Sequence, residues 1–500
     1  MQLLKTSSGR LAQLLLQVTI LAAPANAQGA SNQPTPTQPQ TAPSQSNVEW
    51  TVMVYMNGKN TLESAALANF QQMAQIASSD KVKIVAELGR PMKSHSGAAG
   101  NWGGVMRFYI ERPNIQPLRA EAINPDDPVV RNADMGSPKT LDEFVSWAKS
   151  NYRAKKYLLI IWNHGQGWRL ELQYADAIAI RTLAPRANRM ALDQLTSTSN
   201  EGQSPSTKAP GQSLLGGYRS VSFDEDTGNF LYNRDIENVL QKNPVDVIGF
   251  DACLMSMVET AYAFRNVAKV FVGSEELVPN NGWPYDEWLS VLEASPEMNP
   301  PTLGTTLVNS YASYYRNNGN ATLSAIDLSR IPDLIKALNT FSLLAKSKFD
   351  SERLVWEHSR TQILNFGDWY SESWDQCEGA NVIRFHGIDL AALLSNVRTE
   401  TKDAELSRSA LSVLQAMQSA VLKKYASSAS STLTYGSQGL AIYFPGSEKD
   451  YICDRDHGGY DKQAIAQGKV QAPPEFVQNT AWADFIRAYL NSHPGGPVDK

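Results

Sequence analysis

Short apolar runs alternate with segments of helical periodicity along the first half of the chain. The runs WTVMVYM (50–56) and VDVIGF (245–250) predict buried strands, and YLLIIW (157–162) is apolar on both sides of its pleat, as a central parallel strand is. Apolar residues recur at helical spacing over 61–76 and 140–150, between these runs. Strands and helices that alternate in this order form crossover units. The pattern therefore predicts an α/β fold with a mostly parallel sheet flanked by helices.

The pattern changes after residue 296, where longer helical segments prevail. Helices are expected at 302–316, 330–347, 350–364 and 404–425, with the short strands ATLSAIDL and QGLAIYF between them. This arrangement predicts two domains: an α/β domain over 49–296 and an α-rich domain over 297–500, packed on the first. Inside the first domain, residues 169–217 are polar and rich in Ser, Thr, Gly and Pro, and they predict a long surface insertion.

The N-terminus has the composition of a targeting segment. Lys5 and Arg10 precede the apolar stretch 11–23, and small residues at 25–27 fit a cleavage site, so residues 1–27 are predicted to be a signal peptide. Residues 28–48 are Gln, Pro, Thr and Ser with little to bury, which indicates a disordered linker. The protein is therefore expected to be exported, to the periplasm or out of the cell.

Composition and charge argue against two classes of function, nucleic-acid binding and membrane spanning. The chain has 500 residues, of which 42% are hydrophobic, and a net charge of −5, which becomes −7 when Lys5 and Arg10 leave with the signal peptide. The chain has no basic excess, which argues against a nucleic-acid partner. No later apolar run reaches the roughly 18 residues of a membrane-spanning helix.

The chain has three cysteines, at positions 253, 377 and 453. Export favours disulfides, and an odd count leaves at least one thiol unpaired. A pairing of Cys377 with Cys453 is one alternative, and it leaves Cys253 as the free thiol. A free thiol on an exported protein indicates a functional role more often than an accidental one.

Two predicted strands end in reactive groups. YLLIIW leads into His164 and Gly165, and VDVIGF leads into Asp251 and Cys253. If the two strands are parallel neighbours, all these groups emerge at the same edge of the sheet. A thiol nucleophile and an imidazole base are the requirements of a cysteine protease. The N–H groups of Gly165 and Cys253 are then candidates to bind an oxyanion. The alternatives are that Cys253 is a core thiol and that Asp251 caps a helix after Cys253.

These motifs resemble those of the caspase, gingipain and legumain superfamily. WNHGQGW, GFDACLM and the later GSEELVPNNGWPYDEWL are similar to the clostripain family in particular. The resemblance implies a caspase-like fold, with His164 as general base and acid and Cys253 as nucleophile. It also implies that Asp251 forms the floor of a pocket for Arg or Lys, so the expected substrates are proteins or peptides with basic residues. The sequence requires no cofactor and assigns no metal ligand; calcium is implied by the resemblance alone.

The insertion separates His164 from Cys253 and carries basic residues. Its candidate cleavage positions are Arg181, Arg186, Arg189 and Lys208. Exposed polar segments are preferred sites of proteolytic nicking. Clostripain relatives are processed between their two catalytic residues, so the resemblance implies activation by self-cleavage here. The alternative is a passive surface loop.

A few further residues are candidates for a catalytic, metal-binding or cleft-lining role. His386-Gly387 leads into a helical pattern without a second motif, and His457 lies in a polar loop. In that loop Asp454, Asp456 and Asp461 miss the usual calcium spacing. Trp162, Trp168 and Trp283 are candidates both for a cleft wall and for the core.

Three functions follow from this reading of the sequence. The leading one is a secreted cysteine endopeptidase that cleaves after Arg or Lys. The second is an enzyme with the same dyad but a different specificity, or a thiol hydrolase that acts on non-peptide substrates. The third is a catalytically silent peptide-binding module at the cell surface.

Overall fold

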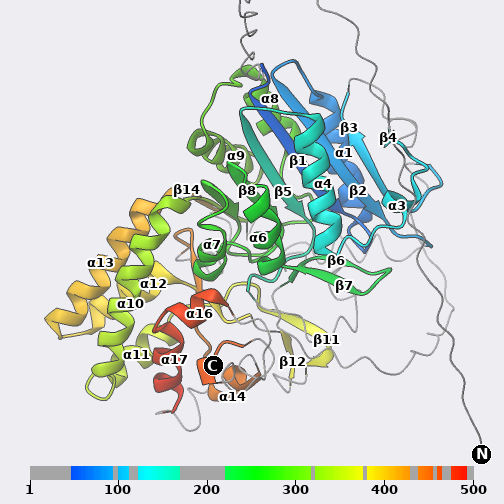
Figure 1. Cartoon of the computed structure of the whole chain (residues 1–500). Coiled ribbons are helices and arrows are strands. Elements are labelled where there is room, and N and C mark those ends of the chain that lie inside the picture. Colours follow the sequence, from blue (N-terminus) through cyan, green and yellow to red (C-terminus); the bar gives the residue numbers. More distant parts are fainter. Residues whose placement is uncertain are drawn as a thin grey trace, which may run out of the picture. The chain divides into compact units, whose positions relative to one another are not determined.

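The computed structural model describes residues 47–93, 100–111, 122–168, 220–316, 321–375, 380–383, 385–427, 437–453, 459–463 and 474–491 (Figure 1). These stretches belong to a unit that spans residues 45–500. The predicted signal peptide and the predicted insertion lie outside the described residues. The four candidate cleavage positions in that insertion also lie outside them, and so do Cys377, Asp454, Asp456 and His457.

Nine strands of the described chain form the central sheet, in the order β14-β10-β9-β8-β5-β1-β2-β3-β4. Their bounds are β1 Trp50–Asn57, β2 Val82–Arg90, β3 Gly104–Tyr109, β4 Ala122–Ile123, β5 Lys156–Trp162, β8 Val247–Asp251, β9 Val270–Gly273, β10 Thr322–Asp327 and β14 Val421–Ala426. The five adjacent strands β9, β8, β5, β1 and β2 run parallel. The outer strands pair antiparallel. The predicted α/β class is therefore confirmed.

The central strands are buried because both faces of the sheet are covered. All eight residues of β1 are buried. Successive side chains point to opposite faces of a strand. Met53 and Tyr55 accordingly join the hydrophobic core on one face, and Val52 and Val54 join the core on the other. This double burial explains the nearly continuous apolar runs of the sequence.

Helices from the first half of the chain cover each face. The core that contains Tyr55 receives side chains from α4 (Pro138–Asn151), α6 (Asn233–Lys242) and α7 (Val258–Phe264). The opposite core receives them from α1 (Glu63–Ile76), α8 (Tyr285–Ala294) and α9 (Pro300–Tyr314). Figure 1 shows α4 and α6 across one face of the strands and α8 and α9 beside the sheet.

Longer helices follow, as the sequence predicts. They are α10 Ile331–Ser347, α11 Arg353–Thr361, α12 Leu390–Glu400, α13 Ala404–Ala420 and α17 Trp482–Asn491. Helix α10 packs against α13 and α17. Their apolar faces join the same core as α4, α6 and α7.

The helix predicted over 404–425 is too long. It ends at Ala420, and the next six residues form β14, which pairs antiparallel with β10. A partner strand overrides the helical pattern there, because pairing satisfies the backbone of both strands. The central sheet thus continues past residue 296, where the sequence places the end of the first domain.

Short elements complete the described chain. Three two-stranded sheets are formed by β6 (Ser220–Asp224) with β7 (Asn229–Tyr232), β11 (Trp369–Asp375) with β12 (Ala380–Ile383), and β13 (Gly387–Asp389) with β15 (Ala441–Tyr443). The short helices are α3 Pro128–Arg131, η4 Leu328–Arg330, α14 Glu448–Cys453 and α16 Glu475–Asn479.

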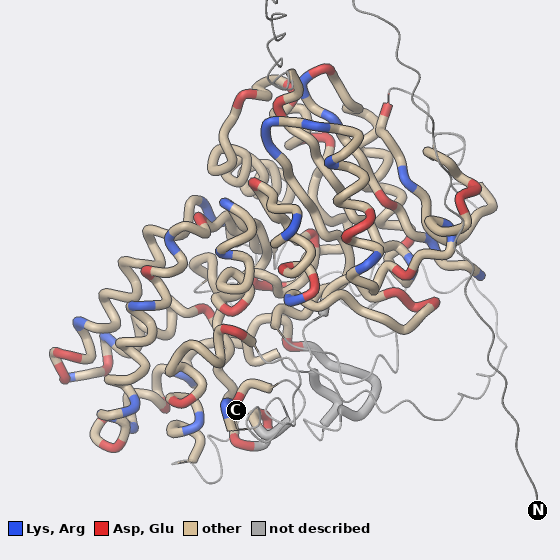
Figure 2. The backbone as a smooth tube through the Cα atoms, in the orientation of Figure 1, with Lys and Arg blue, Asp and Glu red and all other residues tan. Residues whose placement is uncertain are grey.

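Charges of both signs are interspersed along the described elements (Figure 2). A mixture of this kind gives little long-range attraction for polyanions. Among the described residues, no helix combines the length and the apolar character that a membrane span requires.

We expect a chain that ends at residue 296 to fail to fold. It lacks β10 and β14, so β9 becomes an exposed edge, and both hydrophobic cores lose side chains. Circular dichroism and size-exclusion chromatography of residues 45–296 and 45–500 test this expectation. A cooperative, monomeric 45–296 would contradict it.

Candidate active site

The parallel pairing of β5 with β8 brings the two reactive strand ends together. Trp162, the last residue of β5, lies opposite Asp251, the last residue of β8. The pairing continues one residue further, because the Asn163 N–H donates to the Asp251 carbonyl at 3.3 Å. His164 and Cys253 follow directly, so both leave the same edge of the sheet.

Gly165 packs directly on the backbone of Cys253. A Cβ atom at position 165 would lie 2.6 Å from the Cys253 carbonyl oxygen and 3.2 Å from its nitrogen. Contacts this short exclude any side chain, so glycine is required for this approach. Neither the Gly165 nor the Cys253 N–H donates to another residue in the described part of the chain. Both donors are therefore available to an oxyanion.

The Cys253 thiol is half-buried and neutral at rest. Its sulfur accepts a hydrogen bond from the Val278 N–H at 3.3 Å. Burial raises the pKa of the thiol to about 12, although the bond from Val278 opposes the shift; the charges of Glu276 and Asp251 add to it. Cys253 is therefore a thiol rather than a thiolate at rest, and it needs a base before it can attack an electrophile.

The turn after Cys253 is strained. Leu254 has a φ of +62°, a conformation that costs a residue with a side chain roughly 1 kcal/mol. The Leu254 N–H donates to the Glu276 carbonyl at 3.2 Å, which holds the turn. The next helix, α7, begins only at Val258, and its N-terminus has no side-chain cap. The alternative role of Asp251 as a helix cap is therefore wrong.

His164 is half-buried at the end of β5. Its carbonyl accepts from the Ser222 N–H at 3.3 Å, and Gly165 forms a β-bridge with Val221, so β6 fixes the backbone here. Burial lowers the pKa of His164 to about 4. The imidazole is therefore neutral near pH 7, the form that accepts a proton. Its Nε2 atom lies 3.4 Å from Thr61 Oγ1.

Asp251 is buried, with 3% of its surface exposed. Its Oδ2 atom accepts from the Trp283 N–H at 3.0 Å and from the Tyr285 hydroxyl at 3.2 Å. Its Oδ1 atom has no hydrogen-bond partner among the described residues. Burial raises the pKa of Asp251 to about 7, against the effect of the two hydrogen bonds. One carboxylate oxygen is thus left for a donor from outside the chain.

Gly282 allows the chain to pass close to this carboxylate. A Cβ atom at position 282 would lie 2.8 Å from Asp251 Oδ2, and the residue has a φ of +63°. The segment from Gly282 to Tyr285 therefore wraps around one side of Asp251. The family-like phrase GSEELVPNNGWPYDEWL contains this segment and Val278, and it is the signal in the sequence for these neighbours. Thr61 has no comparable signal, because its loop lies about a hundred residues before His164.

The other residues that the sequence analysis named as candidates lie away from the strand-end site or pack in the hydrophobic core. Trp162, Trp168 and Trp283 are buried, so they pack rather than line an open cleft. His386 is buried, with its Nε2 4.0 Å from Asp450. The carboxylate of Asp461 already accepts from a tyrosine hydroxyl, a backbone N–H and an arginine.

Metal and disulfide predictions stay open. No group of three or more His, Cys, Asp or Glu residues within the described ranges is placed to hold a metal ion. Calcium therefore remains a prediction from the family resemblance. Cys253 is a free thiol, while the pairing of Cys377 with Cys453 involves residue 377, outside the described ranges.

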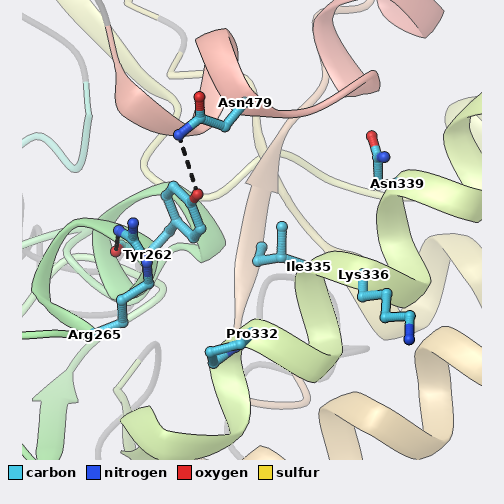
Figure 3. Close-up of a pocket in the computed structure, with 7 residues that line it drawn as sticks. All are labelled: Tyr262, Arg265, Pro332, Ile335, Lys336, Asn339 and Asn479. Atoms are coloured by element: carbon cyan, nitrogen blue, oxygen red, sulfur yellow. Dashed lines mark hydrogen bonds between the residues drawn. The ribbon is translucent and has the colours of Figure 1, made fainter.

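A surface groove of about 310 Å³ lies between α7, α10 and α16 (Figure 3). Its lining residues are Tyr262, Arg265, Pro332, Ile335, Lys336, Asn339 and Asn479. The Arg265 guanidinium pairs with both carboxylate oxygens of Glu475, at 2.7 and 2.9 Å. The groove has no nucleophile and no imidazole, so it is separate from the strand-end site.

Comparison with known proteins assigns this arrangement to a family. The sequence model of the clostripain family matches residues 54–197 and 212–489. Clostripain from Hathewaya histolytica is 25% identical over 445 residues, which cover 81% of this chain and 76% of that protein.

Solved structures share the fold. An inactive zymogen of a C11 protease from Parabacteroides distasonis matches with a TM-score of 0.52 and 17% identity, over 84% of this chain and 99% of that one. A secreted C11 cysteine protease from Bacteroides thetaiotaomicron, in complex with an irreversible peptide inhibitor, matches with a TM-score of 0.51 and 16% identity, over 83% and 98%. With the family model matched over most of its length, the chain belongs to the clostripain family and is a cysteine endopeptidase.

Proposed function

We propose that this endopeptidase cleaves peptide bonds after Arg or Lys, with Cys253 as nucleophile, His164 as general base and acid, and Asp251 as the partner of the basic side chain. One observation carries the proposal. The β5–β8 pairing delivers an imidazole, a thiol and a buried carboxylate with one unpartnered oxygen to a single sheet edge.

The neutral resting state defines the first chemical step. His164 takes the thiol proton as the Cys253 sulfur attacks the carbonyl carbon of the substrate. The carbonyl oxygen becomes an oxyanion, and the N–H groups of Gly165 and Cys253 donate to it. The imidazolium then protonates the leaving amine, and a thioester remains on Cys253. Water, deprotonated by His164, releases the carboxylic acid and restores the thiol.

The basic specificity depends on the free oxygen of Asp251. Because Oδ2 already accepts two hydrogen bonds, the substrate cation meets the carboxylate through Oδ1. Further donors of an ammonium or guanidinium need other acceptors. The buried hydroxyl of Tyr311 also has no partner among the described residues. Burial raises the pKa of Tyr311, and the charges of Tyr315, Asp251 and Cys253 add to the shift, which indicates its proximity to the site.

Export is part of the same proposal. Residues 1–27 have the charged start, the apolar stretch and the small residues of a signal peptide. The matched protease from Bacteroides thetaiotaomicron is described as secreted. We therefore propose that the enzyme acts outside the cytoplasm, in the periplasm or beyond the cell.

Self-cleavage between the dyad residues is the second part of the proposal. The segment 169–219 leaves the described chain after Trp168 and returns at Ser220, where β6 begins. Val221 of that strand forms a bridge with Gly165, so the described chain that follows the segment lies beside the residue after His164. A basic residue tethered at both ends near the site reaches it at roughly millimolar effective concentration. The relative from Parabacteroides distasonis was solved as an inactive zymogen.

The dyad is tested by replacing each member. The substrate is a fluorogenic peptide with Arg before the reporter group. We expect Cys253→Ala and His164→Ala each to lower kcat at least about 1000-fold. The double variant should be as active as either single variant, because the two residues act as a unit. His358→Ala, on an exposed face of α11, is the matched control and should retain activity. Activity in either dyad variant would refute the assignment, and an inactive parent would favour the silent peptide-binding alternative.

The second prediction concerns Asp251. We expect Asp251→Asn to lower kcat/KM for Arg and Lys substrates by a factor equivalent to about 2–5 kcal/mol, since a buried charge partner is lost. Alkylation of Cys253 by iodoacetamide should not fall, because the Asp251 charge is one cause of the raised thiol pKa. Asp246→Asn, at the amino end of β8, is the control for loss of a buried carboxylate. Unchanged cleavage after Arg by Asp251→Asn would place the pocket elsewhere.

The pKa of Asp251 predicts a pH dependence of cleavage after basic residues. The carboxylate has a pKa of about 7 in the free enzyme, so kcat/KM for basic substrates should fall as the pH decreases through about 7 and Asp251 becomes protonated. His164, with a pKa of about 4, stays neutral over this range and does not produce this limb. Alkylation by iodoacetamide, which is uncharged, follows the thiolate fraction of Cys253 and should rise steadily with pH instead of levelling off above about 7. A matching limb for both would assign the titration to the nucleophile or the base.

Self-cleavage is tested with purified protein. We expect the parent to separate into two associated fragments, with the new N-terminus after Arg181, Arg186, Arg189 or Lys208, whereas Cys253→Ala stays whole. Mass spectrometry and N-terminal sequencing give the cleavage position. A single-chain parent with full activity would show that the insertion is not an activation switch.

A further inference from the structure

The loop between β1 and α1 brings a hydroxyl group to His164. Thr61 is exposed, and its Oγ1 atom lies 3.4 Å from His164 Nε2. We propose that Thr61 is a positioning residue that accepts the Nε2 proton of His164, so that Nδ1 takes the proton of the Cys253 thiol. This inference rests on the proposed dyad and adds a third member to it.

The role follows from the protonation state of the base. A neutral imidazole has one N–H group and one nitrogen lone pair, and only the lone pair accepts a proton. His164 is neutral at working pH because burial lowers its pKa. Nδ1 is assigned to the thiol because Nε2 faces Thr61; a proton on Nδ1 would then leave the lone pair on the Thr61 side of the ring. An acceptor at Nε2 therefore selects the competent tautomer and stabilises the imidazolium that forms.

One strand holds both partners of this contact. The Ser222 N–H of β6 donates to the His164 carbonyl at 3.3 Å. From the loop side, the Asn57 amide donates to Ser222 Oγ at 3.1 Å, and the Asn60 amide donates to the Phe223 carbonyl at 2.8 Å. Displacement of the loop relative to His164 thus requires several buried hydrogen bonds to break.

A buried ion pair fixes the same loop. The Lys59 ammonium lies 2.8 Å from Asp224 and 3.4 Å from Asp226, and only 4% of the lysine side chain is exposed. The Lys59 carbonyl accepts from the Glu225 N–H at 3.0 Å. Because Lys59 is two residues before Thr61, this anchoring limits the motion of the threonine although its own side chain is exposed.

The experiment compares two replacements of Thr61. Thr61→Val keeps the β-branched shape and removes the oxygen, whereas Thr61→Ser keeps the oxygen. We expect Thr61→Val to lower kcat about 10-fold or more with KM within about twofold, and Thr61→Ser to stay within about threefold of the parent. Thr340→Val, an exposed threonine on α10, is the control for the same chemical change and should match the parent.

A direct readout is independent of turnover. In protein with ¹⁵N-labelled histidine, the two ring nitrogens of His164 should show one tautomer, protonated at Nε2, in the parent and in Thr61→Ser. Thr61→Val should show a mixture. The signals of the His164 ring nitrogens are identified by their absence from the spectrum of His164→Ala.

The outcomes separate this inference from the proposed dyad. Inactive His164→Ala and Cys253→Ala, together with a fully active Thr61→Val, would overturn the role of Thr61 alone. A parent imidazole protonated at Nδ1, or a Thr61→Ser variant as slow as Thr61→Val, would also overturn it. Retained activity in His164→Ala would instead refute the dyad, whatever Thr61 does.

Discussion

β5 and β8 run side by side in the same direction, with Trp162 opposite Asp251, and the positions of the functional groups follow from this pairing. Two adjacent parallel strands release their next residues at one edge of the sheet. Gly165 lies on the Cys253 backbone because nothing but hydrogen extends from its Cα atom. A register shift of one residue would turn the buried side chains to the opposite face and separate the imidazole from the thiol.

Burial at this edge gives the site its electrostatic character. It raises the pKa of Cys253 and of Asp251, and it lowers that of His164, so the free enzyme favours uncharged groups. The Asp251 carboxylate is itself one cause of the raised thiol pKa. A cationic side chain paired with Asp251 removes this contribution, because the two charges offset each other. Under the proposed function, recognition of a basic residue would thus also make the thiol easier to deprotonate.

The sequence predicted the parts of the site that follow from local pattern. Buried strands are recognisable by their apolar runs, and the residues after them, His164 and Cys253, follow from the geometry of parallel sheets. Val278 was signalled only by the family-like phrase that contains it. Thr61 was not predictable from local pattern, since it reaches the site through long-range packing. The helix expected over 404–425 was wrong at its end for the same reason: β10 decides that Val421–Ala426 is a strand, and β10 is about a hundred residues away.

The α-rich half of the chain is part of the scaffold that holds Cys253. Leu254 holds a strained conformation directly after Cys253, and strain persists only where surrounding contacts enforce it. Several of these contacts come from beyond residue 296. The Ser256 carbonyl accepts from the Ala441 N–H at 2.9 Å, and the Glu276 carboxylate accepts from the Gly367 N–H at 3.0 Å.

Helix α7, which follows the nucleophile turn, is fixed in the same way. Its buried Glu259 accepts from the Tyr443 N–H at 3.0 Å and from the Tyr460 hydroxyl at 2.5 Å. The turn that carries Cys253 is therefore held on one side by Glu276 and on the other by β15. This arrangement gives a physical reason why the family match extends to residue 489 rather than ending with the strands that lead into His164 and Cys253.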